Sequence, residues 1–391
     1  MADRIILLSL DGIGVGALPG TGSGDDGGAH TLAHVADAVG GLRVPNLEAL
    51  GLGYLGAIAG VRRTGQPDGC FGRMAGLSPG TDSAAGHWEM MGLVLEKPFP
   101  AYPKGLPADV IESLQQALGR KVIGNYAASA AAILPDLGVQ HVNTGSPIVF
   151  TGTGSVVQIA AHERMLPLEE LYGMCRTARR LLAFPHQVAR VIARPFAGEA
   201  GAFLYAAGRR DFSIEPPGPT LLDFLKAAGY PVIGIGRIDD LFKGRGLTRA
   251  LPVHSDAAAL DETLRVLKSV PRGLIFTHLI AGAPRAEHRH AAQGAAEALQ
   301  AVDARLPDLI GGMQQDDLLC ITADHGNDPA RPDSDHTREH VPVLVYGSRV
   351  ARGVNLGTRK SLADLGQTIA EALGIKRLAR GESFLPAIVQ G

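Results

Sequence analysis

The residues best suited to chemistry form a carboxylate and imidazole pattern near the end of the chain. Asp324 and His325 closely follow the apolar run 318–321, which is typical of a buried strand, and His336 comes eleven residues after His325. One carboxylate and two imidazoles suit a divalent cation such as Mn²⁺, Zn²⁺ or Fe²⁺. The alternative is an ordinary polar turn. Open α/β sheets bind ligands at the carboxyl ends of their strands, so the position favours a metal site.

A second strand-end carboxylate lies at the start of the chain. The apolar run 4–10 leads directly into Asp11, and the glycine-rich segment 12–16 follows. Crowded glycines also occur in dinucleotide-binding fingerprints, but there the acid comes after the glycines. That fingerprint also needs a glycine and the start of a helix at segment 17–19, but the sequence there is Ala-Leu-Pro, which provides neither. Asp11 is therefore interpreted as a metal ligand.

A hydroxyl group directly follows a carboxylate at Asp82 and Ser83, at an expected junction between a loop and a helix. A serine at such a junction normally caps the helix. The alternative is a nucleophile, because a nearby divalent cation promotes loss of the hydroxyl proton and helix N-terminal amides stabilise an attached phosphoryl group. His87 and Trp88, one turn later, are interpreted as structural residues.

Composition indicates a globular protein, and its cysteine content indicates a reducing compartment. The chain has 391 residues, of which 46% are hydrophobic and 19% charged, so it can bury a large core and form two domains. A formal net charge of −2 argues against nucleic-acid or membrane partners, and no apolar run has membrane-spanning length. No signal peptide precedes the first strand, which predicts a cytoplasmic protein. The cysteines are few and scattered, which predicts buried thiols; they are Cys70, Cys175 and Cys320.

Apolar runs alternate with helical patterns, which predicts an α/β fold with a mostly parallel sheet covered by helices. Further core elements are expected as strands at 230–236, 273–276 and 341–346 and as a helix at 292–310. The middle of the chain differs, because proline-rich segments 97–104 and 214–219 bracket it. It contains expected helices at 108–118 and 168–182 and a strand at 147–151. We therefore expect an inserted α+β cap domain at 99–215 and a metal-binding core domain at 1–98 and 216–391.

Motifs along the whole chain carry a family resemblance. They include the segments 10–16, 30–34, 45–53, 86–92, 123–125, 158–163, 190–196 and 321–342. Gly-His-Trp-Glu together with Ala-Asp-His-Gly-Asn-Asp and Asp-His-Thr-Arg-Glu is highly specific, and the chain resembles the bacterial phosphopentomutases of the alkaline phosphatase superfamily. The resemblance implies an alkaline-phosphatase-like core and interconversion of ribose 1-phosphate and ribose 5-phosphate. It also implies two divalent ions, usually Mn²⁺ with Zn²⁺ or Mg²⁺ as alternatives, and a phosphorylated residue primed by a sugar bisphosphate.

The resemblance also implies roles for individual residues. Ser83 takes the place of the family's phosphorylated threonine. The implied metal ligands are Asp11, Asp324 and His325 for the first ion and His288 and His336 for the second. The carboxylate expected for the second ion is replaced by Ala283, so weak or fractional occupancy is expected there. Nearby residues that could substitute for this ligand are Glu287, His278 and His290.

The resemblance places Arg194 and Arg209 as the cap residues that grip the distant phosphate, a task suited to a planar guanidinium. The family's ribose-contacting serine and aspartate are replaced by Gly152 and Gly154, and its lysine before the aspartate–nucleophile pair is replaced by Thr81. A loop shifted by a residue or two could instead offer Thr153 or Ser155. These departures fall in the site while scaffold motifs remain, which indicates functional divergence and predicts poor turnover of ribose 5-phosphate.

The favoured function is intramolecular phosphoryl transfer on a small phosphorylated sugar through a phosphoserine. The alternatives are a metal-dependent phosphohydrolase of the same superfamily and a catalytically weak descendant that binds a phosphometabolite. A cap that shields the phosphoenzyme from water favours the mutase. The sequence leaves open which sugar is used and which oligomer forms.

Overall fold

A computed structural model describes residues 2–18, 28–63, 65–152, 154–183, 186–279, 291–331 and 336–389. Ala283, Glu287, His288 and His290 therefore lie outside the described residues. The chain divides into two compact units, one formed by Met1–Lys97 with Pro216–Gly391 and the other by Pro98–Glu215.

The larger unit is built on an eight-stranded sheet in the order β10-β9-β11-β1-β12-β13-β2-β14. These strands are β1 (Arg4–Leu10), β2 (Cys70–Met74), β9 (Val232–Ile235), β10 (Arg249–Leu251), β11 (Gly273–Leu279), β12 (Asp317–Thr322), β13 (Val341–Tyr346) and β14 (Asn355–Arg359). β13 is antiparallel to both neighbours, and the other pairs are parallel. β1, β11 and β12 are buried along their whole length, as expected where helices cover both faces. The prediction of a mostly parallel sheet is confirmed.

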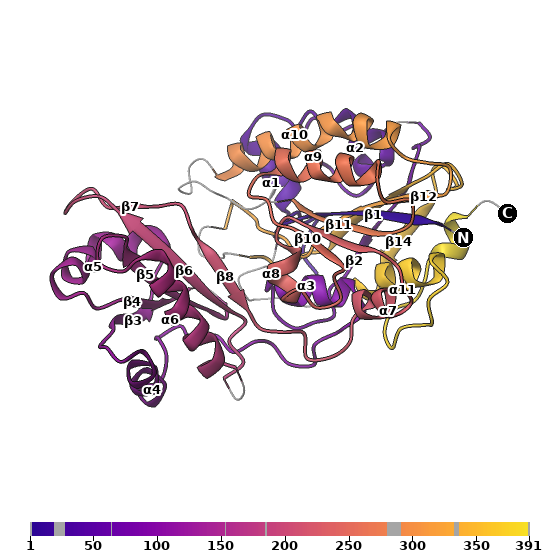
Figure 1. Ribbon diagram of the computed structural model, residues 1–391. Helices are drawn as coiled ribbons and strands as arrows, with labels where there is room; N and C mark the ends of the chain where they lie inside the picture. Colours follow the sequence, from indigo (N-terminus) through magenta and orange to yellow (C-terminus); the bar gives the residue numbers. More distant parts are fainter. Residues whose placement is uncertain are drawn as a thin grey trace. The chain divides into compact units, whose positions relative to one another are not determined.

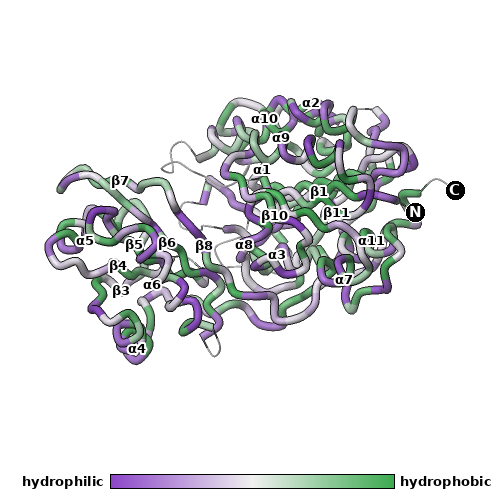
Figure 2. The backbone as a smooth tube through the Cα atoms, viewed as in Figure 1, coloured by the Kyte–Doolittle hydropathy of each residue, from purple (hydrophilic) through white to green (hydrophobic). Residues whose placement is uncertain are grey.

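Helices cover this sheet on two faces. They are α1 (Thr31–Ala38), α2 (Pro45–Leu50), the 3₁₀ turn η1 (Leu52–Tyr54), α3 (Ser83–Met90), α7 (Leu221–Ala227), α8 (Ile238–Phe242), α9 (Asp256–Leu267), α10 (Ala291–Gly311), α11 (Ala363–Ala372) and α12 (Leu385–Ile388). α1, α2, α9 and α10 gather on one face, and α3, α7, α8 and α11 gather on the other (Figure 1). The hydrophobic colour along β1 and β11 marks the core between these layers (Figure 2). The predicted amphipathic helix at 292–310 is confirmed as α10.

The smaller unit has a six-stranded sheet with the path β3-β4-β5-β6-β7 and with β8 paired to β6. Its strands are β3 (Ile123–Ala127), β4 (Ile148–Thr151), β5 (Val156–His162), β6 (Arg190–Ala197), β7 (Leu204–Tyr205) and β8 (Arg210–Ser213), and its helices are α4 (Ala108–Leu118), α5 (Ala130–Thr144) and α6 (Leu168–Leu181). Two separate hydrophobic clusters line the sheet, one including residues of α4 and α6 and one including residues of α5. The predicted strand and both predicted helices of this region are confirmed.

Candidate active site and metal centre

The strand register of the larger unit brings the two strand-end carboxylates together. β1 and β12 are parallel neighbours in which Ser9 pairs with Thr322. Asp11 and Asp324 each come two residues later, so both leave the sheet at the same edge. The backbone N–H of Gly12 donates to Asp324 Oδ1 at 3.1 Å, which joins the two strand ends directly.

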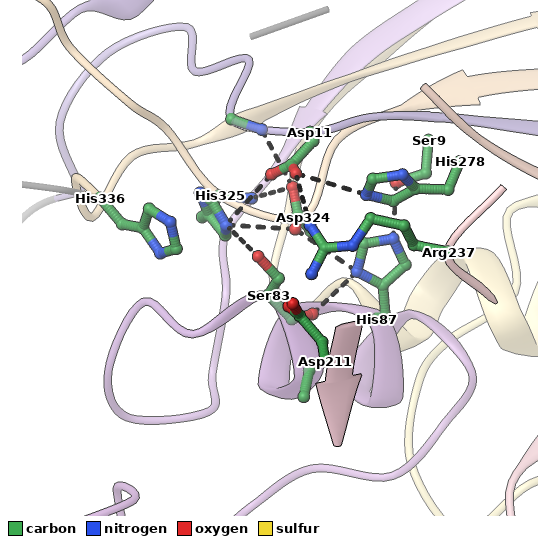
Figure 3. A network of polar contacts seen from close by, with 12 residues as sticks. Ser9, Asp11, Ser83, His87, Asp211, Arg237, His278, Asp324, His325 and His336 are labelled. Carbon is green, nitrogen blue, oxygen red and sulfur yellow. Dashed lines mark hydrogen bonds and ion pairs between the residues drawn. The ribbon is translucent and has the colours of Figure 1, made fainter. Parts of the chain in front are cut away.

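The side chains of Asp11, Asp324 and His325 form a group that can hold one cation. One ligand atom from each lies within 4.8 Å of the others, and all three residues are buried (Figure 3). His325 Nε2 is 3.1 Å from Asp324 Oδ2 and 3.6 Å from Asp11 Oδ1. Among the described residues, Asp324 Oδ2 has no hydrogen-bond partner of acceptable geometry. A buried carboxylate oxygen in that state is costly, and a cation would satisfy it. The residues therefore fit a divalent metal ion.

The electrostatics of the group keep its two carboxylates ionised. Burial alone would raise the pKa of Asp324, but His325 and His87 hold that pKa well below its ordinary value. Burial and Asp324 would raise the pKa of Asp11, but His278 and His325 hold it below its ordinary value as well. Burial lowers the pKa of His325, yet the two carboxylates outweigh this and raise it to about 9. Both carboxylates are thus ionised at neutral pH.

Ser83 is the first residue of α3, and its hydroxyl faces the metal group. The interpretation of Ser83 as the helix cap is wrong, because Asp82 is the N-cap and its side chain accepts from the backbone N–H of Ala84 at 2.8 Å. Asp82 has extended backbone torsions, so its carboxylate turns back onto the helix start. The Ser83 hydroxyl instead lies 2.9 Å from His325 Nε2. It is thus placed at a helix N-terminus beside a candidate metal centre.

His87 lies behind the nucleophile position and is fully buried. Its Nδ1 donates to the carbonyl oxygen of Ser83 at 2.8 Å, and its Nε2 is 3.0 Å from Ser9 Oγ. Nδ1 is also 3.4 Å from Asp324 Oδ2. The imidazole therefore ties the first turn of α3 to β1 and to a candidate ligand. The neighbouring Trp88 is fully buried, which confirms its prediction as a core residue.

Two further side chains lie close to Oδ2 of Asp11. His278 Nε2 lies 3.4 Å from Asp11 Oδ2, and Arg237 Nη1 lies 3.8 Å from the same atom (Figure 3). His278 is completely enclosed, and neither of its ring nitrogens has a hydrogen-bond partner among the described residues. Sequence reasoning named His278 as a substitute ligand but missed Arg237. The available signal was its position after β9, which neighbours β11 in the parallel sheet.

His336 contacts the group formed by Asp11, Asp324 and His325 through the ring of His325. Its ring stacks on that of His325 with 3.9 Å between centroids and 22° between planes. Its Nδ1 is 2.6 Å from the carbonyl oxygen of Thr81 and therefore donates to it. The structure thus brings His336 to the first metal group, while its expected partner His288 lies outside the described residues.

Of the two predicted phosphate-gripping arginines in the smaller unit, one lies on strand β6 and the other directly before strand β8. Arg194 is in β6, and Arg209 directly precedes Arg210, which pairs with Ala193 in β6. The Arg194 guanidinium donates to Gln158 Oε1 and lies 5.3 Å from the centroid of the Tyr205 ring.

Arg209 is held by an acidic neighbour on β8. Its Nε and Nη2 donate to the two carboxylate oxygens of Asp211 at 3.1 and 3.3 Å. Arg190 adds a third cation to this face, with Nη1 3.7 Å from Asp211 Oδ2. The face is thus rich in guanidinium groups, as an anion site requires.

Comparison with known proteins agrees with this geometry. Residues 237–377 match the family model of the Metalloenzyme superfamily. Phosphoglycerate mutase from Leishmania mexicana has a similar fold, with a TM-score of 0.50 and 14% identity over 100% of this chain and 98% of that one. The α/β core, the candidate metal group at its sheet edge and the matched family model together indicate a metalloenzyme.

Full-length relatives narrow the class to one family. The chain is 45% identical over 390 residues to the phosphopentomutase of Alkaliphilus metalliredigens, with 100% of both chains covered. It is 48% identical over 388 residues to that of Dictyoglomus turgidum, covering 99% of this chain and 98% of the relative. The chain belongs to the phosphopentomutase family. Within its described residues, no helix combines the length and apolar character needed to cross a membrane.

Proposed function

We propose that this protein is a metal-dependent phosphopentomutase that moves a phosphoryl group between two hydroxyls of one phosphorylated pentose through a phosphoserine at Ser83. The observation that carries this proposal is the Ser83 hydroxyl at the N-terminus of α3, 2.9 Å from His325 Nε2 and beside Asp11 and Asp324. Family membership at 45–48% identity supports the same reaction.

The reaction uses two balanced transfers. Phosphorylated Ser83 gives its phosphoryl group to the free hydroxyl of the pentose monophosphate: the new P–O bond forms, the Ser83 Oγ–P bond breaks, and the proton of the sugar hydroxyl is balanced by the proton that Ser83 Oγ regains. After the resulting bisphosphate turns around, Ser83 Oγ takes its other phosphoryl group and releases the isomer. The amides of the first turn of α3 stabilise the phosphoryl group on Ser83. A sugar bisphosphate primes the serine before the first cycle.

Asp11, Asp324 and His325 would hold the first metal ion, and His336 with His288 would help to hold the second. A bound divalent ion, with Mn²⁺ preferred, lowers the pKa of the serine hydroxyl and neutralises phosphoryl charge. Asp11 and Asp324 are ionised below neutral pH, so neither carboxyl group has to lose a proton before a cation binds. His325, whose pKa is raised to about 9, would release its proton as the ion binds.

Residues 99–215 serve as the substrate-binding cap, and the rest of the chain serves as the catalytic core. Arg194 and Arg209 grip the phosphate that is not being transferred. A cap that excludes water keeps the phosphoserine from hydrolysis while the bisphosphate turns around, which is the property that separates a mutase from a hydrolase.

Ser83→Ala tests the proposal. The variant should lose turnover of pentose phosphates and the phosphoserine signal in mass spectrometry, with little change in melting temperature because Asp82 caps the helix. Ser255→Ala is the matched control, since Ser255 caps α9 by accepting from Ala258 N at 3.3 Å. That control should cost about 1 kcal/mol of stability and keep full activity. Normal activity of Ser83→Ala would refute the covalent route, and inorganic phosphate as the main wild-type product would identify a hydrolase.

A further inference from the structure

The carboxylate of Glu339 is buried close to the proposed metal centre without belonging to the proposed ligands. It is 3% exposed and accepts four hydrogen bonds. Oε2 accepts from the backbone N–H groups of Gly16 and Thr31 at 3.1 and 2.9 Å. Oε1 accepts from the hydroxyls of Thr31 and Thr337 at 2.6 and 2.7 Å. One charged group therefore satisfies donors from three separate segments, a role for which an ionised carboxylate is well suited.

The two hydroxyls extend this connection to the loop after β12. Thr31 Oγ1 accepts from the backbone N–H of Asn327 at 2.9 Å, and Thr337 Oγ1 accepts from that of Asp328 at 3.2 Å. These amides lie two and three residues after His325. The backbone that follows His325 is thus connected to Glu339 at two residues, at Asn327 through the Thr31 hydroxyl and at Asp328 through the Thr337 hydroxyl.

Two glycines let both ligand-bearing loops pack against the same carboxylate. A Cβ added at Gly14, in the loop after Asp11, would overlap the Glu339 carboxylate. A Cβ at Gly326, directly after His325, would overlap it too. Gly326 also exchanges backbone hydrogen bonds with Thr337 at 3.1 and 2.9 Å. The carboxylate therefore sits between the loop that follows β1 and the loop that follows β12.

We propose that Glu339 is a positioning residue that holds the loops of Asp11 and His325 in the arrangement that binds the metal ion. The inference rests on the metal centre of the proposed function. Removing the negative charge leaves buried N–H and O–H donors without acceptors, so the two loops relax. Supporting residues of this kind typically change metal affinity by about 10- to 100-fold.

Glu339→Gln tests this inference by measuring Mn²⁺ affinity through the electron paramagnetic resonance signal of free Mn²⁺. The amide matches the carboxylate in size but has one acceptor oxygen and brings two N–H donors of its own. Glu89→Gln is the matched control. Glu89 is 1% exposed and accepts from Leu77 N, Ser78 N, Ser361 Oγ and Leu362 N at 2.8, 2.6, 2.8 and 3.1 Å. None of these four donors belongs to a proposed ligand loop.

Both variants should melt at lower temperature, because each loses a buried acceptor. Only Glu339→Gln should bind Mn²⁺ at least about tenfold more weakly. Thr31→Val is a milder second variant that cuts the single link between Asn327 and Glu339, and we expect a smaller loss of affinity in the same direction. A purely structural role would lower the melting temperature without changing Mn²⁺ affinity.

The outcomes separate the two proposals. Mn²⁺ affinities of Glu339→Gln and Thr31→Val within about twofold of wild type would overturn the inference alone, and so would an equal loss of affinity in Glu89→Gln. A loss of about tenfold or more in Glu339→Gln, absent from Glu89→Gln, supports it. A wild-type protein that binds no Mn²⁺ would overturn the metal centre itself and the inference with it.

Discussion

Asp11 and Asp324 carry two negative charges into the buried edge of a sheet. Their mutual repulsion is balanced in part by the charged form of His325 and by Arg237, whose Nη1 lies 3.8 Å from Asp11. A divalent cation between the carboxylates would remove this repulsion and satisfy Asp324 Oδ2. Metal binding should therefore stabilise the folded protein as well as activate it.

The first prediction is a metal-dependent melting temperature. Mn²⁺ at about 100 times its Kd should add about 2.7 kcal/mol to the free energy of unfolding, and a chelator should remove that gain. Differential scanning calorimetry of metal-free and Mn²⁺-loaded protein measures the effect. Asp324→Asn should melt at nearly the same temperature under both conditions. Equal melting temperatures for metal-free and loaded wild type would contradict the prediction.

The second prediction concerns the order of metal binding. Asp11, Asp324 and His325 would supply two carboxylates and an imidazole to the first ion. The second ion lacks the carboxylate expected at Ala283, so it should bind more weakly unless Glu287 or His278 supplies a ligand. Titration calorimetry with Mn²⁺ should resolve one tight and one weak event, and His278→Asn shows whether the imidazole contributes to the weak event. Two equally tight ions in both proteins would show this order to be wrong.

At the scale of elements, the approach of α3 to the end of β12 decides whether nucleophile and metal group meet. Gly86 lies on α3 where an added Cβ would overlap the backbone oxygen of Asp324. Only hydrogen fits at this contact. The helix can therefore bring Ser83 to His325 because its next turn carries no side chain against the strand.

The third prediction follows from this contact. Gly86→Ala should push α3 away from Asp324 and reduce turnover by roughly tenfold or more, since a shift of about 1 Å in a reacting group is costly. Gly294→Ala is the control, because Gly294 lies in α10 with nothing within 4 Å of an added Cβ. That control should raise stability by up to about 1 kcal/mol through helix propensity and leave turnover unchanged. Full activity of Gly86→Ala in steady-state assays would show that the contact tolerates a methyl group.

At the scale of the whole molecule, the proposed function assigns substrate choice to the smaller unit. Gly152 follows β4, and a Cβ there would lie 3.1 Å from Gln158 Nε2. The same Gln158 amide accepts from Arg194 through its oxygen. A side chain at Gly152 would thus contact the residue that accepts from Arg194, so the loop and the proposed phosphate-binding arginine are linked through Gln158.

The fourth prediction is that the enzyme turns over ribose 5-phosphate poorly, if at all. Gly152 and Gly154 supply only backbone groups where the family resemblance expects two polar side chains. Each lost hydrogen bond to a sugar hydroxyl costs about 0.5–1.5 kcal/mol, so two would lower kcat/KM for this sugar by roughly ten- to a hundredfold. Comparing kcat/KM across pentose, hexose and deoxysugar phosphates measures this. Ribose 5-phosphate as the best substrate at an efficient rate would contradict it.

The sequence by itself determined which strands lead into Asp11 and Asp324. It also determined the family to which the protein belongs. A strand-length apolar run followed by a polar residue is a local pattern. The hydropathy of adjacent residues predicts both the buried strand and the point where it ends. A parallel sheet then requires such ends to meet at one edge. Local patterns of this kind were sufficient to predict the strands and helices named above in both units.

Only the tertiary structure decided which polar residue does what at that edge. Asp82 and Ser83 are both good N-cap residues, and the packing of α3 against the strand end gave the cap to Asp82 and turned the Ser83 hydroxyl to His325. Glu339 reaches Gly16 across 323 residues of chain, and no local periodicity reports such a contact. Side-chain roles of this kind depend on which distant segments pack together, because the hydrogen bonds that fix them join residues that the sequence keeps far apart.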